Sequence, residues 1–397
     1  MKRVLSFLVW AVPALLLVAV LVIFEVVPAR IDASMNPVVP DPEAPAPSAA
    51  AAALHDTLLV ADLHADALLW GRDSTRAQER GHTDFPRLRA GGTFLQVFSV
   101  VTKSPSGQND VENSADAADQ ITPLVVVQRW PRRTYGSLKE RARYQAERLR
   151  AWETKDENFR IIRSQADLRQ ALTDHETNPD LLVGVLATEG SHALEGDLGA
   201  IETLYNDGYR MMGLHHFFDN RLGGSLHGTS KAGLSDFGKA AVDKMVAMDI
   251  MIDVAHSSEA VVWDVLARTG RPLVVSHTGF KGACDRPRNI SDELMIAIAE
   301  RGGLIGVGYW QAAICDPTPD GVARMIRYGI DLVGEDAVAL GSDFDGTVAV
   351  PFDASGLVQL TDALLRAGLT EAQITKVMGG NQIRFFLEHL AEGDAAL

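Results

Sequence analysis

Imidazole and carboxylate side chains follow short apolar runs at several distant places in this sequence. They are His64 with Asp66, Glu189, His256, His277 and Asp343. Nitrogen and oxygen donors of these types bind Zn²⁺, and a carboxylate near a metal-activated water can carry its proton. The residue types therefore predict a metal-dependent hydrolase, provided that the fold brings these positions together.

The apolar runs that precede these residues are typical of strands buried on both faces, because they are short, β-branched and bounded by polar turns. Eight strands are expected, at residues 58–63, 94–100, 182–188, 210–215, 250–255, 273–276, 304–308 and 338–342. Amphipathic helical patterns separate most of them, as at 235–246, where Ser235 is the expected cap, and this alternation indicates a parallel sheet. In a parallel barrel the carboxyl ends of all strands open on one face, where such enzymes build their active sites. We therefore expect an α/β fold, a TIM-like (β/α)8 barrel that gathers the candidate residues at its mouth.

The long stretch 101–181, between the second and third expected strands, carries charged helical sequence. We expect it to form helical insertions on the outside or rim of the barrel. A doubly wound open sheet is the alternative fold. That fold usually has a glycine-rich phosphate loop after its first strand, and this chain has His64-Ala65-Asp66 there instead.

Each candidate ligand has a simpler explanation when it is taken alone, since a single histidine is more often a packed core residue than a ligand. Their joint occurrence after several strands favours a metal site. Glu189 has two oxygens that could bridge a pair of cations ~3.5–4 Å apart, the usual spacing in two-metal hydrolases. Asp343 lies in the turn 341–346, where it could carry a proton, whereas Asp345 suits a turn carboxylate. The polar residues expected to be structural are His192, His227, Asp219 and Asp253.

Residues 1–27 are predicted to form a membrane anchor. Lys2 and Arg3 are basic, and residues 4–24 carry no charge. This apolar run matches the ~20 residues that a membrane-spanning helix needs and exceeds the ~7–15 of a signal peptide. The basic end would stay in the cytoplasm and place the rest of the chain on the extracytoplasmic side. A cleaved signal peptide is the alternative, and it predicts export to the same compartment.

Residues 28–54 are rich in proline and alanine and predict a semi-extended linker, which leaves residues 55–397 as one barrel domain. With 397 residues and 47% hydrophobic content, the chain can bury one large core. The net charge of −15 argues against nucleic-acid binding, which requires a basic face. A homodimer is neither required nor excluded by the sequence.

Nine short stretches, in their order along the chain, make it similar to the membrane dipeptidase (renal dipeptidase) family of zinc metallopeptidases. They are 62–66, 188–190, 210–216, 233–238, 252–256, 275–277, 288–293, 341–346 and 379–381, so the resemblance covers about residues 56 to 390. It implies a TIM-like barrel that hydrolyses dipeptides with two Zn²⁺ ions and a hydroxide held between them. Some family members also accept dehydropeptides, D-residues at the C-terminal position or certain β-lactams.

The resemblance implies a set of five metal ligands. His64 and Asp66 would bind one zinc ion. His256 and His277 would bind the other. Glu189 would bridge the two ions with its two oxygens.

The resemblance also implies roles for two further side chains and for the cysteines. His216 would face the substrate carbonyl and stabilise the oxyanion, and Arg288 would bind the substrate carboxylate. Asp343, placed after the last strand, would then move the proton from water to the leaving amine. A disulfide between Cys284 and Cys315 is implied as well, and two unpaired thiols are the alternative.

Two other functions remain open at this point. Another amidohydrolase-type barrel could act on lactones, phosphotriesters, cyclic amides or β-lactams, but many of these bridge their metals with a modified lysine. No lysine stands at an expected strand end here. A catalytically silent, membrane-tethered binding protein is the second alternative, and it would not need the complete set of ligands. Zinc determination together with a dipeptide hydrolysis assay separates all three.

Overall fold

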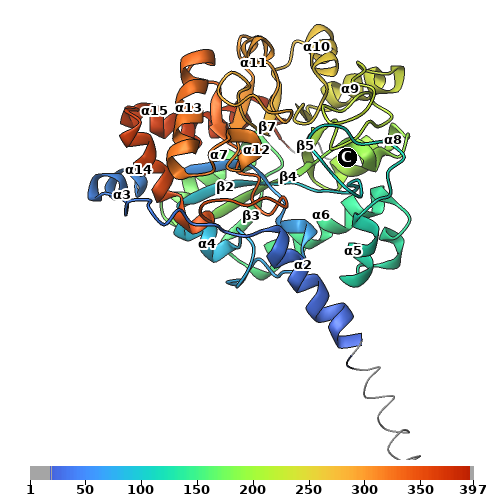
Figure 1. The fold of residues 1–397 in the computed structure, drawn as a ribbon, viewed down its shortest axis with the longest axis horizontal. Coiled ribbons are helices and arrows are strands. Elements are labelled where there is room, and N and C mark those ends of the chain that lie inside the picture. The colour runs from blue at the N-terminus through green and yellow to red at the C-terminus, as the bar shows by residue number, and fades with distance from the viewer. Residues whose placement is uncertain (1–17, 19, 394–397) are drawn as a thin grey trace, which may run out of the picture.

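Eight parallel strands close into a barrel at the centre of the structure, a computed structural model that describes residues 18 and 20–393 (Figure 1). The strands of the sheet are β1 (Val60–Ala65), β2 (Thr93–Phe98), β3 (Phe159–Ile161), β4 (Leu182–Thr188), β5 (Tyr209–Gly213), β6 (Met251–Asp253), β7 (Val274–Thr278), β8 (Leu304–Val307) and β9 (Val338–Leu340). β2 pairs directly with β4, and β9 pairs with β1, so the ring contains every strand except β3. The expected TIM-like barrel is confirmed, and each of its eight strands overlaps one of the predicted ranges.

Helices connect the strands and surround them (Figure 1). They are α2 (Val27–Met35), α3 (Ala49–His55), α4 (Phe85–Ala90), α5 (Ile121–Val127), α6 (Leu138–Lys155), α7 (Gln165–His175), α8 (Gly199–Asn206), α9 (Asp236–Ala247), α10 (Glu259–Arg268), α11 (Asp292–Ala299), α12 (Gln311–Ile314), α13 (Pro319–Val333), α14 (Val358–Arg366), α15 (Glu371–Thr375) and α16 (Asn381–His389), with the short turns η1 (Val22–Val26), η2 (Ala67–Leu69), η3 (Arg132–Thr134), η4 (Ser191–Leu194), η5 (Ala354–Gly356) and η6 (Lys376–Gly380). Ser235 caps α9 as expected, because its hydroxyl accepts a hydrogen bond from the backbone N–H of Gly238 at 3.0 Å.

The stretch between β2 and β4 differs from the expectation in one respect. It contains the expected helices α5, α6 and α7, but residues Phe159–Ile161 form the additional strand β3. This strand pairs with residues 182–184 of β4, just before the part of β4 that pairs with β5. This strand is short and carries the exposed Arg160 at its centre, so it lacks the continuous apolar run that marks the equally short β6 and β9.

Apolar side chains pack against both faces of the barrel strands. One cluster joins strand residues to helices that include α9, α10, α13 and α14, and a second joins them to α7 and α16. Every residue of β1, β2 and β4 is buried, as expected for strands that are covered on both faces. Strand ends that carry the candidate site therefore stand on a fully buried support.

The first part of the predicted linker, up to Met35, is a helix that ion pairs of a buried carboxylate attach to the barrel domain. In α2, Asp32 is buried, and its Oδ2 lies 3.1 Å from Nε of Arg72 and 2.8 Å from Nε of Arg80. Both arginines belong to the loop between β1 and β2. This segment is therefore docked on the barrel domain. It is helical, whereas the sequence predicted a semi-extended conformation.

The second part of residues 28–54 is also attached to the domain. Val38 forms a β-bridge with Val350, and the hydroxyl of Ser48 donates a hydrogen bond to Oδ1 of Asp362 at 2.7 Å, where α3 packs on α14. The proline and alanine content indicated extension, but alanine is also the strongest helix former. Composition gives no sign of the individual polar contacts that fix the chain.

The predicted anchor, residues 1–27, lies for its greater part outside the described residues. In the portion that is described, no helix has both the length and the apolar character needed to cross a bilayer. Residues 20–35 are helical, and the chain enters the domain through α2. Membrane insertion of residues 1–27 stays a prediction.

Candidate metal centre

The carboxyl ends of six strands bring the predicted ligands and proton carrier into one cluster. His64 lies in β1 and Asp66 just after it, Glu189 follows β4, His216 follows β5, His256 follows β6, His277 lies in β7, and Asp343 follows β9. All of these side chains are buried. Residues nearly 280 positions apart therefore share one site because parallel strands end on the same face of the barrel.

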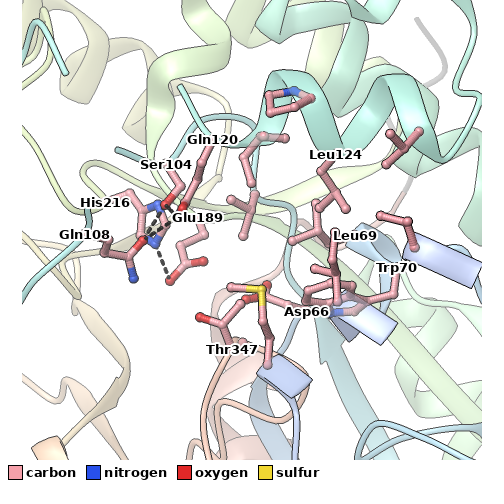
Figure 2. A pocket seen from close by; sticks show the side chains of 18 residues that line it. Asp66, Leu69, Trp70, Ser104, Gln108, Gln120, Leu124, Glu189, His216 and Thr347 are labelled. Atoms are coloured by element: carbon pink, nitrogen blue, oxygen red, sulfur yellow. Dashed lines mark hydrogen bonds and ion pairs between the residues drawn. The ribbon is translucent and has the colours of Figure 1, made fainter. Parts of the chain in front are cut away.

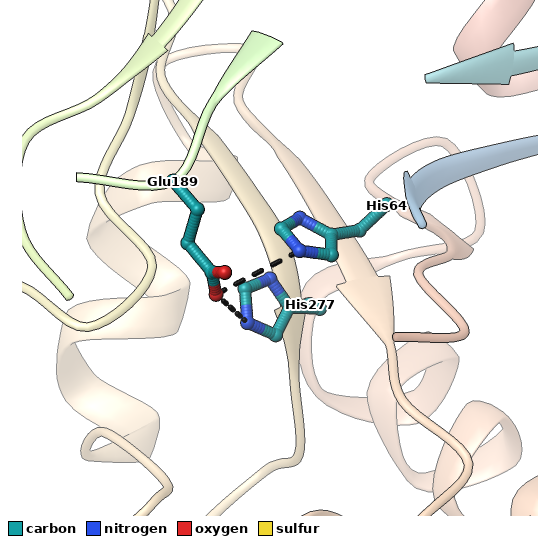
Figure 3. A group of neighbouring side chains, drawn as sticks. All are labelled: His64, Glu189 and His277. Atoms are coloured by element: carbon teal, nitrogen blue, oxygen red, sulfur yellow. Dashed lines mark ion pairs between the residues drawn. The ribbon is translucent and has the colours of Figure 1, made fainter. Parts of the chain in front are cut away.

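Glu189 lies at the centre of this cluster, and Figure 3 shows its carboxylate directed at both His64 and His277. Its Oε1 is 3.7 Å from Nε2 of His64, 3.3 Å from Nε2 of His277 and 3.2 Å from Nε2 of His256. Nε2 of His64 is also 3.6 Å from Oδ1 of Asp66. The two Nε2 atoms of His256 and His277 are 2.9 Å apart. Among the described residues, three groups of side chains are close enough to hold a metal ion: His64 with Asp66 and Asp343, His64 with Glu189 and His277, and Glu189 with His216 and His256. Glu189 belongs to two of these groups.

The donor atoms fit a divalent metal. Nε2 of His64 and Oδ1 of Asp66 are buried and have no hydrogen-bond partner among the described residues. A buried polar atom left in this state costs ~1–3 kcal/mol, so these two atoms call for another partner. Imidazole nitrogens and carboxylate oxygens together are a typical donor set for zinc.

The electrostatics of the site also favour a cation. Burial raises the pKa of Glu189 well above its usual range, and the Asp66 carboxylate raises it further. Burial and Asp66 likewise raise the pKa of Asp343 to about 8, against the opposing effect of His64. Although burial lowers the pKa of His64, the charges of Glu189 and Asp66 outweigh it and raise that pKa to about 10. A divalent cation would displace the extra proton that the raised pKa keeps on His64. It would also stabilise the charged forms of Glu189 and Asp343 and so lower the pKa values of these two carboxyl groups again.

One hydroxyl group orients two of the histidines. Oγ of Ser276 donates a hydrogen bond to Oδ2 of Asp253 at 2.6 Å, and it lies 2.9 Å from Nδ1 of His277 and 3.3 Å from Nδ1 of His64. Because its only proton goes to Asp253, the hydroxyl accepts from both Nδ1–H groups. Each Nε2 is thereby directed at the cluster. Asp253 is structural, as expected, but the role of Ser276 was not predicted.

A buried carboxylate in β1 holds two of the site loops. Oδ1 of Asp62 accepts a hydrogen bond from the backbone N–H of His64 at 3.0 Å, and Oδ2 accepts one from the N–H of Ser342 at 2.9 Å. Gln96 of β2 donates to the same carboxylate at 3.2 Å. Sequence reasoning missed this role, although a charged residue inside a buried strand is itself a signal, because it must find partners there.

The backbone is strained at two of the site residues. His256 has a φ of 62° and Asp343 a φ of 59°, in the left-handed region that residues other than glycine rarely adopt. Such conformations cost ~1–3 kcal/mol each and persist only where surrounding contacts enforce them. Near Asp343, the buried Asp345 accepts a hydrogen bond from the N–H of His82 at 2.6 Å and pairs with Arg72 at 2.9 Å, so its carboxylate is structural.

Of the two adjacent histidines after β5, only His216 reaches the cluster. Its Nε2 is 3.5 Å from Oε1 of Glu189, as Figure 2 shows, and its Nδ1–H donates to the carbonyl of Lys103 at 3.2 Å. Burial lowers the pKa of His216 to about 4. His215 instead contacts Oγ of Ser257 through Nδ1 at 3.1 Å.

Arg288 is buried beside the histidines, on the loop that follows β7. Its Nη2 donates to the carbonyl of His277 at 2.6 Å and lies 3.4 Å from Nε2 of His256. Its guanidinium carbon is 5.3 Å from the centre of the Trp310 ring. Nε of Arg288 is buried and has no hydrogen-bond partner among the described residues, so part of the guanidinium is free for a ligand.

The disulfide implied by the family resemblance is present. Cys284 and Cys315 are bonded, with their Cα atoms 5.7 Å apart. Cys284 belongs to the same loop as Arg288, and Cys315 follows α12, the short helix that begins after Trp310. The bond therefore ties together the two loops that place the guanidinium and the indole ring next to each other.

Two cavities meet at the metal centre. The first has a volume of about 380 Å³ and is lined mainly by apolar side chains from α2, α5 and the region around η2. The second, of about 170 Å³, is polar and contains Arg288 and Asp343. The residues that line both are Gln108, Glu189, His216, Gly346 and Thr347. A substrate whose reacting group lies at Glu189 and His216 would therefore extend into an apolar space on one side and a charged space on the other.

We expect Ser276→Ala to weaken metal binding, because two ligand histidines lose the hydroxyl that sets their orientation. Losses of this kind usually amount to about 10–100-fold in affinity. Competition with a chelator of known affinity measures the change. Ser164→Ala is the matched control, since Ser164 is an equally buried hydroxyl that only caps α7. An unchanged affinity in Ser276→Ala would show that the hydroxyl does not orient the ligands.

Comparison with known proteins gives one curated relative of note. It is described as an uncharacterized protein in the pqqA 5' region of Klebsiella pneumoniae, and it is 30% identical over 242 residues, which span 57% of this chain and 87% of the relative.

Solved structures share the fold over most of their length. A metallo peptidase from Rhodobacter sphaeroides, liganded with a phosphinate mimic of the dipeptide L-Ala-D-Ala, has a TM-score of 0.68 and 24% identity, covering 84% of this chain and 100% of its own. The probable dipeptidase PvdM from Pseudomonas aeruginosa has a TM-score of 0.72 and 20% identity, covering 87% of this chain and 98% of its own. At these identities the similarity establishes the fold.

The family is established by a separate comparison with models of protein families. The model described as membrane dipeptidase (peptidase family M19) matches residues 48–394, which include every strand of the barrel and both cysteines. The chain therefore belongs to the membrane dipeptidase family, a family of metallo-dipeptidases.

Proposed function

We propose that this protein hydrolyses dipeptides with two zinc ions bound at the cluster around Glu189. His64 and Asp66 would hold one ion. His256 and His277 would hold the other, with Glu189 between them. The observation that carries this proposal is the position of Glu189, whose Oε1 lies within 3.2–3.7 Å of three imidazole nitrogens and which belongs to two groups of potential metal ligands. When bound, the zinc ions supply Lewis-acid chemistry, which polarises a carbonyl and lowers the pKa of water.

Arg288 would bind the free carboxylate of the substrate. A guanidinium binds a carboxylate through two parallel hydrogen bonds, and such charge-assisted bonds are strong. The side chain is buried and lines the polar cavity, so a carboxylate there would face a positive charge shielded from water. The phosphinate dipeptide mimic bound by the Rhodobacter sphaeroides relative supports a substrate of this size.

Asp343 would take the proton of the attacking water and pass it to the leaving amine. Its Oδ1 lies 3.9 Å from Nε2 of His64, on the side of the cluster that also faces the polar cavity. A carboxyl group whose pKa is raised by burial can hold and release a proton near neutral pH. No serine or cysteine nucleophile is needed for this reaction.

His216 would stabilise the negative charge that develops on the carbonyl oxygen. Its Nδ1–H is already used by the carbonyl of Lys103, so donation from Nε2 requires the doubly protonated imidazolium. Burial opposes that form, whereas Oε1 of Glu189, 3.5 Å from Nε2, favours it. His216 would therefore act as the imidazolium, with a proton on both ring nitrogens.

We also propose that residues 1–27 anchor the protein, with the barrel on the extracytoplasmic side of the membrane. The uncharged run 4–24 after Lys2 and Arg3 supports this orientation. The Cys284–Cys315 disulfide supports it as well, because such bonds persist in oxidising compartments.

The proposed function is tested by metal analysis and a dipeptide assay on the wild type and Asp343→Asn. We expect two zinc ions per chain in both proteins and hydrolysis by the wild type alone. Loss of proton transfer should lower kcat by about 10²–10⁴-fold. Asp331→Asn, an exposed carboxylate that pairs only with Arg327, is the control. If Asp343→Asn keeps its zinc and more than a tenth of the wild-type rate, Asp343 does not carry the proton.

Removal of the substrate carboxylate should abolish efficient turnover. We expect kcat/KM for a dipeptide to exceed that for its C-terminal amide by at least ~100-fold, since the buried charge of Arg288 would otherwise lack a partner. Arg288→Lys should lower kcat/KM for the dipeptide but not for the amide, because lysine keeps the charge and loses the paired geometry. Equal kcat/KM values for the dipeptide and its amide in the wild type would rule out this role.

The anchor is tested by fractionating cells that make the full chain. We expect the protein in the membrane fraction, with the barrel domain digested by protease added to the extracytoplasmic side. Mass analysis of the purified protein provides the second readout. A soluble chain that begins after residue 27 would show instead that the segment is a cleaved signal peptide.

A further inference from the structure

The apolar cavity beside the metal centre has a wall that lies outside the family-matched region. The family match begins at residue 48, whereas α2 ends at Met35. Val27, Ile31 and Met35 of this helix nevertheless line the cavity. They are spaced four residues apart and therefore lie on one face of α2, while Ala33 on the opposite side is exposed.

A second wall of the cavity comes from the stretch between β2 and β4. Ile121, Leu124 and Val127 of α5 line the cavity there, and Leu69 and Trp70 line it from the region of η2. Figure 2 shows Leu69, Trp70 and Leu124 on one side of this space and Glu189 and His216 on the other. These apolar residues form a small hydrophobic cluster of their own, separate from the barrel core, against which Ile31 and Met35 pack.

The wall formed by α2 is held in a defined place. Asp32, on the same helix, is buried between Arg72 and Arg80. Asn36, directly after the helix, accepts a hydrogen bond from the backbone N–H of Thr347 at 2.9 Å. Thr347 itself lines both cavities, so the helix is bonded to the rim of the site.

The position of Arg288 decides which part of a dipeptide meets this wall. If the C-terminal carboxylate binds Arg288 in the polar cavity, the scissile carbonyl lies near Glu189 and His216, which both cavities share. The residue on the other side of the scissile bond then extends into the apolar cavity. Its volume of about 380 Å³ falls within the ~300–1,000 Å³ typical of ligand pockets.

We propose that α2 completes a specificity pocket for a large apolar side chain on the N-terminal residue of the substrate. This inference rests on the proposed dipeptidase function and adds a substrate class to it. Dipeptides that begin with leucine, methionine or phenylalanine fill the pocket and remove its apolar walls from water. Dipeptides that begin with glycine leave it empty, and those that begin with aspartate or lysine would bury an unpaired charge there.

The test compares Leu-Ala with Gly-Ala in the full chain carrying Ile31→Ala and Met35→Ala together. We expect kcat/KM for Leu-Ala to fall about tenfold, chiefly through KM, because a smaller apolar wall weakens binding of the ground state and of the transition state alike. For Gly-Ala, kcat/KM should stay within twofold of the wild type. Val26→Ala with Val39→Ala is the matched control, since these exposed valines flank α2 and do not line the cavity.

A second variant tests the pocket by filling it. Ile31→Trp should lower kcat/KM for Leu-Ala at least tenfold and spare Gly-Ala, and thermal unfolding verifies that both variants fold. Equal losses for the two dipeptides in either folded variant, or a wild type that prefers Gly-Ala or Asp-Ala, would overturn the specificity pocket. If the zinc-loaded wild type hydrolyses no dipeptide at all, the proposed function itself is overturned.

Discussion

The concentration of buried charge at the barrel mouth is the constraint on which the rest of the structure depends. Asp66, Glu189 and Asp343 are buried together, and Arg288 is buried beside them. Carboxylates removed from water repel one another and favour their protonated forms unless a cation compensates them. The neighbouring imidazoles and the guanidinium provide part of that compensation. Nε2 of His64 and Oδ1 of Asp66, which have no hydrogen bond among the described residues, mark where the remainder must come from.

A charged cluster of this kind can bind a metal only if its side chains do not rearrange to form ion pairs and hydrogen bonds with one another. The layer beneath it prevents such rearrangement. Ser276 and Asp253 fix two imidazole rings from below, and Asp62 joins β1 to the loop of Asp343. The left-handed backbone at Asp343 shows that these contacts are strong enough to hold a strained conformation. The fold therefore holds the proposed metal ligands in place through these supporting hydrogen bonds.

The sequence predicted most of the barrel and the residues of the site, because buried parallel strands leave continuous apolar runs and their ends carry ligand types. It did not predict contacts that depend on a single side chain meeting a partner far away. Ser276 is an ordinary residue inside a strand until the structure places it between two rings and Asp253. Likewise, alanine and proline content gave no sign that Asp32 would bind two arginines and dock α2. Local patterns report periodicity, whereas these contacts depend on tertiary geometry.

The residues proposed for the reaction and those proposed for substrate choice lie on different parts of the chain. The proposed ligands, the proposed proton carrier and Arg288 all stand on the strand ends and on loops close to them, within the region that the family model matches. The apolar wall stands on α2, before that region, and is attached through Asp32 and Asn36. Changes in α2 can therefore alter the pocket without moving a ligand. Since the proposed anchor continues directly into this helix, a tether at the membrane would act on a wall of the pocket that lies before the family-matched region.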